Sequence, residues 1–198
     1  MPVKDTANAV RLPVELRGAG LDDWSAVREL HASAFRALAG PTLDLSQVAA
    51  FVELIFAPDY TDALLTQDLQ TAWYEGHLVA TAGWVAADDS GASARITAVY
   101  VSPMFQRLGI GRRIVGAAEA RARAAGFRSF TARVFPPALP FFGALGYARS
   151  SQGALSVGTQ NGIPVYFVRK GGGEPSRGHN EDASPSSPHP AEISRRLA

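Results

Sequence analysis

The strongest constraint on the fold is the stretch of residues 99–111, where an apolar strand ends in a glycine loop that becomes a helix. Val99 and Val101 mark the strand, Pro103 breaks it, and Gly109 and Gly111 lie immediately before an alanine-rich helix. Glycines let the backbone turn so that several N–H groups converge, and the helix N-terminus adds a partial positive charge of roughly half a unit. The stretch therefore predicts a cradle for an anion, most often a phosphate.

The spacing of the glycines limits which phosphate-bearing ligand fits this loop. A dinucleotide fingerprint needs a third glycine where the chain has Ile114. A P-loop needs Lys and then Ser or Thr after its second glycine, where the chain has Arg112 and Arg113. Both common nucleotide-binding patterns fail, which leaves a plain strand-to-helix turn or another phosphate ligand.

The loop resembles motif A of the GNAT superfamily of N-acetyltransferases, Gln/Arg-x-x-Gly-x-Gly/Ala. In that family the loop amides hold the pyrophosphate of acetyl-CoA, and the pantetheine arm bonds backbone groups of the preceding strand, which splays from its neighbour. The resemblance thus implies acetyl-CoA as co-substrate. It assigns coenzyme contacts to Val99, Tyr100, Val101, Gln106, Arg107, Leu108, Gly109, Ile110, Gly111 and Arg112.

Residues 138–147 carry a second resemblance, to the end of GNAT motif B, Ala-x-x-Phe-Tyr-x-x-x-Gly-Phe. Two motifs in the family's order imply an α+β GNAT acyl-CoA N-acyltransferase fold, a mixed, mostly antiparallel central sheet flanked by about four helices. The domain is expected over residues 13–170. We expect a flexible N-terminus over residues 1–12 and a disordered Gly/Pro/Ser-rich tail over 171–198, because the tail has few apolar residues.

Hydrophobic periodicity and capping residues predict the remaining elements. Asp22 or Asp23 caps a first helix, and a capping box of Asp44 with Gln47 starts a second helix that ends before Pro58. Residues 58–62 then form a loop. Strands are expected over residues 14–17, 69–74, 78–85, 94–101, 129–134, 151–157 and 163–169.

The helix after the glycine loop has an apolar face and a charged face. Glu119 and Arg123 are spaced to form an i,i+4 pair on the solvated side. Arg112 and Arg113 either reach a coenzyme phosphate or belong to the same solvated face.

The catalytic side chains of the family carry over poorly. Acyl transfer to an amine needs a neutral amine and a stabilised oxyanion, and a general acid can protonate the departing thiolate. The family's frequent Tyr acid aligns with Phe142, its frequent Asn aligns with Phe135, and residues 95–101 contain no carboxylate base. A thiolate with a pKa of about 8 to 9 leaves without much help, and a water chain can take the amine's proton. The sequence therefore names no catalytic residue.

Other polar and aromatic residues have competing interpretations. His31 lies beside the apolar face of the first helix, where a lone histidine is more often partly buried packing than a catalyst. Phe51, Phe56 and Tyr60 either shape an acceptor pocket or serve as core packing and, for Tyr60, an exposed loop ring. The titratable groups near the expected cleft are interpreted as turn or surface residues: Glu75, His77, Asp88, Asp89 and Tyr100.

Composition excludes several other classes of function. The formal net charge of +1 argues against a dedicated nucleic-acid surface, and the absence of cysteine excludes disulfides, Cys-based zinc sites and thiol catalysis. The first residues lack the apolar core of a signal peptide, and the chain has no run of about eighteen apolar residues. We expect a cytoplasmic protein with no metal and no membrane partner.

Two functions from different classes remain. The first is an acyltransferase that moves an acetyl group from acetyl-CoA to a primary amine of an unidentified small molecule or protein, by direct attack in a ternary complex. The alternative is a catalytically degenerate GNAT module that binds acyl-CoA as a sensor or interaction domain. The missing Tyr and carboxylate favour the degenerate module, whereas the phosphate loop is compatible with both functions. The enzyme is the preferred interpretation. The resemblance also allows a homodimer.

Overall fold

The computed structural model describes residues 12–87, 93–157 and 162–171. Within these ranges seven strands form one sheet in the order β1-β2-β3-β4-β5-β7-β6. Neighbouring strands are antiparallel except for the parallel pair β4 and β5, which confirms the predicted mixed, mostly antiparallel sheet. The strands are β1 (Glu15–Gly18), β2 (Asp68–Tyr74), β3 (His77–Ala86), β4 (Ser93–Val101), β5 (Ser129–Val134), β6 (Ala148–Leu155) and β7 (Ile163–Lys170).

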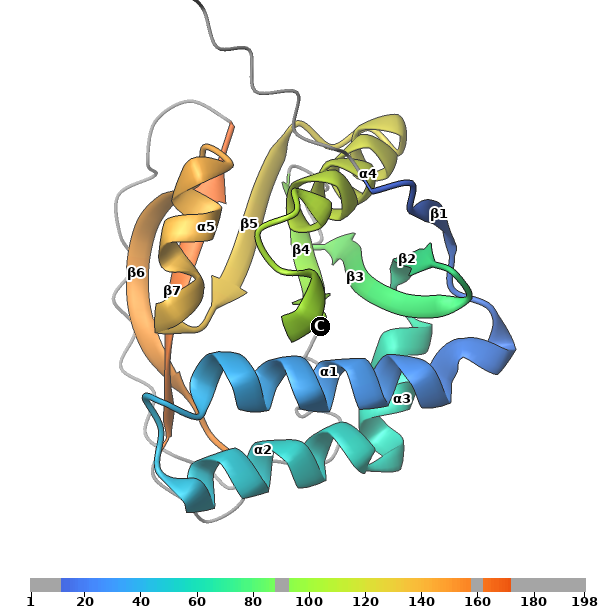
Figure 1. The fold of residues 1–198 in the computed structure, drawn as a ribbon. Coiled ribbons are helices and arrows are strands. Elements are labelled where there is room, and N and C mark those ends of the chain that lie inside the picture. Colours follow the sequence, from blue (N-terminus) through green and yellow to red (C-terminus); the bar gives the residue numbers. More distant parts are fainter. Residues whose placement is uncertain (1–11, 88–92, 158–161, 172–198) are drawn as a thin grey trace, which may run out of the picture.

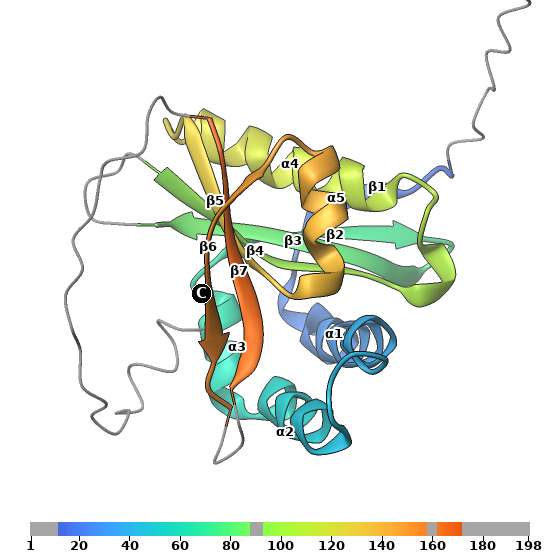
Figure 2. The same cartoon turned by 90° about the vertical axis from the view of Figure 1, so that its left-hand side faces the viewer.

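Helices cover both faces of the sheet (Figure 1). Figure 2 shows α4 on one side of strands β2 to β4, with α1 and α2 on the other side. Each side buries its own apolar cluster. The described helices are α1 (Trp24–Ala39), α2 (Leu45–Phe56), α3 (Pro58–Leu65), α4 (Ile110–Ala124) and α5 (Leu139–Ala144). Among the described residues, no helix combines the length and apolar character that crossing a bilayer requires.

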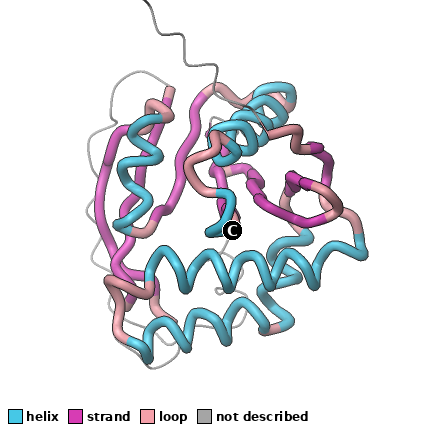
Figure 3. The backbone as a smooth tube through the Cα atoms, in the orientation of Figure 1, coloured by secondary structure: helices cyan, strands magenta, loops and turns pink. Residues whose placement is uncertain are grey.

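The predicted loop at residues 58–62 is wrong, because these residues belong to helix α3 (Figure 3). The capping box of Asp44 and Gln47 at the start of α2 is confirmed. Pro58 does end α2, but Ala57 is extended (φ −67°, ψ 146°) and becomes the N-cap of a new helix with Pro58 in its first turn. Proline suits that position because its missing N–H has no partner there in any case. Tyr60 therefore lies on a helix and is buried.

Glu119 is not solvated as predicted, since only 4% of its surface is exposed. The expected pair with Arg123 forms at 2.8 Å. Two contacts from distant sequence bury the carboxylate: Lys170 Nζ lies 2.9 Å from each oxygen, and the Tyr147 hydroxyl donates to Oε1 at 2.9 Å. This cluster joins α4 to β7, and local periodicity could not predict it.

The first helix and the last hairpin also differ in detail from the prediction. Asp23 is the N-cap of α1, but its side chain makes no capping hydrogen bond. Its carboxylate instead accepts two bonds from Arg17 and one from the Gly20 amide. In the hairpin, β6 begins at Ala148, three residues before the predicted start. The predicted flexible N-terminus and disordered tail fall almost entirely outside the described residues.

The geometry that positions the site is the divergence of β4 from β5. Their parallel pairing stops at Ile96 opposite Ala132, although β4 continues to Val101 and β5 to Val134. Beyond that point the two strands separate (Figure 1), as the resemblance implied.

Candidate functional site

The glycine loop forms the N-terminus of α4 without a side-chain cap. Gly109 is the N-cap and has a left-handed backbone (φ 78°), and Arg107 is also left-handed (φ 65°). The first hydrogen bond of the helix runs from the Arg113 amide to the Gly109 carbonyl at 3.2 Å. The amides from Gly109 to Arg112 thus precede the first intrahelical bond, which is the arrangement of an anion cradle.

The two motif glycines serve different purposes. A Cβ at Gly109 would meet no atom within 4 Å, so this glycine is required by its backbone conformation and leaves open space beside the loop. A Cβ at Gly111 would lie 3.1 Å from the Phe141 ring and 3.4 Å from Val101, so this glycine allows α4 to pack closely against β4 and α5.

The paired arginines are held by protein carbonyls. Arg113 donates to the carbonyls of Leu12 at 2.8 Å and Val14 at 3.2 Å, which ties the segment before β1 to α4. Arg112 donates to the Ala144 carbonyl at the end of α5, at 3.1 Å. The guanidinium of Arg113 is therefore a structural group, whereas Arg112 remains a predicted coenzyme contact beside the loop.

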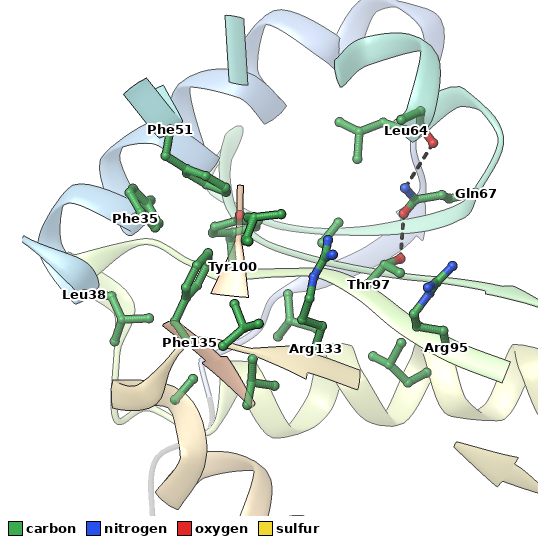
Figure 4. Close-up of a pocket in the computed structure, with 18 of the residues that line it drawn as sticks. Phe35, Leu38, Phe51, Leu64, Gln67, Arg95, Thr97, Tyr100, Arg133 and Phe135 are labelled. Carbon is green, nitrogen blue, oxygen red and sulfur yellow. Dashed lines mark hydrogen bonds between the residues drawn. The ribbon is translucent and has the colours of Figure 1, made fainter. Parts of the chain in front are cut away.

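A cleft occupies the gap between the diverging strands (Figure 4). Its wall on the sheet includes Val99 and Tyr100 of β4, and a bulge displaces β4 at this level, where the register to β3 shifts. Ala98 within the bulge has a left-handed backbone (φ 49°), which costs energy for a residue with a Cβ. On the other side of β4, pairing with β5 ends at Ile96, so the backbone of the following residues borders the gap instead of a neighbouring strand.

Aromatic side chains close one end of the cleft. Phe35 of α1 and Phe51 of α2 have ring centroids 4.1 Å apart, and Phe135 meets them at 5.1 and 5.4 Å. Phe142, which aligns with the family's Tyr acid, is buried and lines the same cleft. Figure 4 shows Phe35, Phe51 and Phe135 grouped beside Tyr100. This end is apolar and offers no proton donor at the position of Phe142.

A buried hydrogen-bond network connects the helices to the bulge. Thr81 donates its single hydroxyl proton to the Ala98 carbonyl at 2.7 Å, so His31 Nε2, 2.8 Å from Thr81 Oγ1, must carry a proton. His31 Nδ1 then accepts the Tyr60 hydroxyl at 2.7 Å. The imidazole also stacks on Tyr100 with ring centroids 4.1 Å apart. The network fixes one neutral tautomer of His31 and supports the strained bulge residue.

These buried groups are neutral at physiological pH. Burial lowers the pKa of His31 to about 3 and raises the pKa of Tyr100 to about 12. Burial and the neighbouring Tyr100 raise the pKa of Tyr60 well above its ordinary value. None of these three groups can act as a general base near neutrality, and no described residue that lines the cleft is a carboxylate. The described residues also contain no cluster of side chains suited to a metal ion.

The structure shows which of the candidate residues from the sequence lie in the cleft. Phe51 and Tyr60 line the cleft, which favours their role in an acceptor pocket, whereas Phe56 is 41% exposed and lies outside it. His31 is fully buried and more constrained than expected. Glu75 and His77 are exposed where β2 turns into β3, while Asp88 and Asp89 lie outside the described residues.

Sequence reasoning missed Arg95 and Arg133, which also line the cleft. Each stands between buried apolar neighbours on an interior strand, a position where a charge is unusual. A charged residue between apolar neighbours in a predicted interior strand was the sequence signal that could have identified them.

Comparison with known proteins identifies the family. Residues 24–147 match the model of the acetyltransferase (GNAT) family, which is more than half of the chain. The chain therefore belongs to the GNAT family. A search of curated proteins gives no match.

Solved structures with low sequence identity share the fold. A GCN5-related N-acetyltransferase from Rhodopseudomonas palustris is 20% identical with a TM-score of 0.71, covering 79% of this chain and 94% of the other. The PaiA N-acetyltransferase of Thermoplasma acidophilum, solved with coenzyme A, is 12% identical with a TM-score of 0.66, covering 81% and 99%. YncA of Salmonella typhimurium, solved with acetyl-CoA, is 18% identical with a TM-score of 0.56, covering 88% and 98%.

Proposed function

We propose that this protein is an acetyl-CoA-dependent N-acetyltransferase that acetylates a primary amine in a ternary complex. The proposal depends on one observation. The cleft between β4 and β5 lies along β4, and the chain leads from the end of β4 to the N-terminus of α4, which has no side-chain cap. GNAT structures with bound coenzyme A or acetyl-CoA support the use of an acyl-CoA by this fold.

The residues present fit such a co-substrate. The amides of Gly109 to Arg112 would hold the pyrophosphate, and the backbone at Val99 and Val101 would bond the pantetheine arm. The coenzyme supplies an activated thioester when bound. Backbone N–H groups of β4 beyond Ile96, where the strand is no longer paired with β5, would stabilise negative charge on the carbonyl oxygen as the amine attacks.

Proton transfer would not depend on an acidic side chain of the cleft. The amine must bind neutral or lose its proton to water, because the described lining residues include no carboxylate and His31 is a very weak base. The thiolate leaves without a side-chain acid, since its pKa of about 8 to 9 makes it an adequate leaving group.

Release of free thiol in the presence of amines tests this function. Because the chain contains no cysteine, a thiol-reactive dye reports only coenzyme A released from acetyl-CoA. We expect release that depends on added amine, above the slow hydrolysis measured without amine, with the acetylated product confirmed by mass spectrometry.

The alternative function predicts a different outcome. A degenerate module would bind acetyl-CoA and give no thiol release with any amine. Phe142 in place of Tyr is the observation that favours this alternative. Binding without turnover across a broad amine panel would therefore contradict the enzyme and support the sensor or interaction domain.

A further inference from the structure

Two arginines share one face of the sheet inside the cleft. Arg95 of β4 lies opposite Thr131 of β5, and Arg133 is two residues further along β5. Side chains two residues apart point to the same face, so the two arginines are diagonal neighbours with Cα atoms roughly 8 Å apart. Figure 4 shows Arg133 between Tyr100 and Thr97 and Arg95 beyond Thr97, whereas Phe35 and Phe51 lie on the other side of Tyr100. The cleft thus has an apolar end and a cationic end.

Among the residues that the structure describes, the lining of the cleft contains no Asp or Glu that would offset the charge of Arg95. Arg95 Nε is buried and has no hydrogen-bond partner. The neutral neighbours are bonded to other groups, because Thr97 donates to Gln67 Oε1 at 2.6 Å and Gln67 Nε2 donates to the Ala63 carbonyl at 3.0 Å.

An uncompensated guanidinium in a partly buried cleft is unfavourable for the protein alone. Burial lowers the pKa of Arg95, which reflects the cost of removing its charge from water. The same group binds an anion strongly, because a planar guanidinium donates two parallel hydrogen bonds to a carboxylate or a phosphate.

We propose that Arg95 and Arg133 bind an anionic group, a carboxylate or phosphate, on the amine acceptor, so that the acceptor class is anionic primary amines. The inference rests on the proposed function, which places the reacting amine near the bulge at Ala98. Arg95 lies three residues from Ala98 along β4, about 10 Å in an extended strand, so the amine and the anion would occupy opposite ends of one acceptor.

Matched acceptors test this proposal. The probes are the ω-amino acids from 3-aminopropanoate to 6-aminohexanoate, their uncharged amides, and 3-aminopropyl phosphate, each with acetyl-CoA in the thiol-release assay. At least one anionic probe should have a kcat/KM about 10-fold to 100-fold above its uncharged counterpart, the range expected for a charge-assisted hydrogen-bonded pair. The proposal would be overturned if every ω-amino acid matched its own amide and 3-aminopropyl phosphate did no better than the amides.

Substitutions assign the effect to these side chains. In Arg95→Gln and Arg133→Gln the advantage of the anionic probe should disappear, whereas Arg36→Gln, which removes an exposed charge from α1, should keep it. Arg95→Met should also raise the thermal midpoint, because it removes a buried N–H without a partner. An advantage that survives in both cleft variants would overturn the assignment.

Two further measurements separate the alternatives. Succinyl-CoA carries a carboxylate on its acyl group. If it binds more tightly than acetyl-CoA, and if this difference depends on Arg95, the anion belongs to the acyl donor and the proposal is wrong. Calorimetric binding of the probes in the presence of coenzyme A does not require turnover. Absence of turnover with every amine would reject the proposed function, whereas absence of preferential binding by the anionic probes would reject the anionic acceptor.

Discussion

Mild acid should destabilise this protein mainly through His31. The ring is fully buried as a neutral tautomer between Tyr60 and Thr81, and burial lowers its pKa to about 3. In the unfolded chain the pKa returns to about 6.5. A group whose folded pKa is lowered contributes its full stability above the unfolded pKa and loses it as the pH falls toward the folded pKa. The sensitive window therefore runs from about pH 6.5 down to about pH 3.

The two pKa values set the size of the effect. Proton linkage with a folded-state pKa of about 3 gives a loss of roughly 2 kcal/mol at about pH 5 and roughly 4 kcal/mol at about pH 3. Carboxylates bind protons mainly below about pH 5, because their ordinary pKa is about 4. The fold lowers the pKa of Glu119 further. The interval between about pH 7 and pH 5 therefore isolates the histidine.

Urea unfolding at a series of pH values, followed by circular dichroism, measures this loss. His31→Gln removes the titrating group, so its free energy of unfolding should be lower at neutral pH but should change little between about pH 7 and pH 5. His77→Gln, at the exposed first residue of β3, is the matched control and should keep the slope of the intact chain. Equal slopes in His31→Gln and in the intact chain would refute the reasoning.

Two other substitutions test contacts of α4. Glu119→Gln should lower stability by about 2 to 3 kcal/mol, because Lys170 loses its buried counter-charge. The deficit, measured by calorimetry, should shrink as the pH falls below the ordinary glutamate pKa of about 4.3, because the unfolded intact chain then binds a proton that the folded carboxylate resists. A constant deficit would contradict the lowered pKa of Glu119. Arg113→Gln should cost about 1 kcal/mol through its bonds to the Leu12 and Val14 carbonyls and leave acetyl-CoA affinity unchanged. A large loss of affinity would instead show that Arg113 contacts the coenzyme.

The fold was predictable where local chemistry decides the structure. The glycine loop specified α4, because a left-handed Gly109 and a close-packed Gly111 leave few other conformations. The capping box of Asp44 and Gln47 marked the start of α2 for a similarly local reason. The strand pattern predicted the meander and the final hairpin to within a few residues.

The site was less predictable because its properties arise from tertiary contacts. Pro58 carries the same local signal whether it ends one helix or begins the next, so the burial of Tyr60 was missed. His31 becomes a fixed tautomer only through Thr81, which is 50 residues away in sequence. Arg95 and Arg133 share a face only because β4 and β5 are adjacent and parallel, an arrangement that neither strand specifies alone.

Binding of acetyl-CoA to an isosteric pair of variants, measured by calorimetry, tests the central claim most directly. Asn and Asp both tolerate the left-handed backbone of Gly109, and their Cβ enters open space, so Gly109→Asn and Gly109→Asp differ mainly in charge. Two like charges about 4 Å apart near a protein surface repel by up to roughly 4 kcal/mol, so Gly109→Asp should bind at least about 100-fold more weakly than Gly109→Asn.

Gly116→Ala, an open position in the middle of the same helix, should bind like the intact chain. Strong binding by the intact chain that is lost selectively in Gly109→Asp would place the pyrophosphate at the N-terminus of α4. Equal affinities of the Asn and Asp variants, or no binding by the intact chain, would contradict the account.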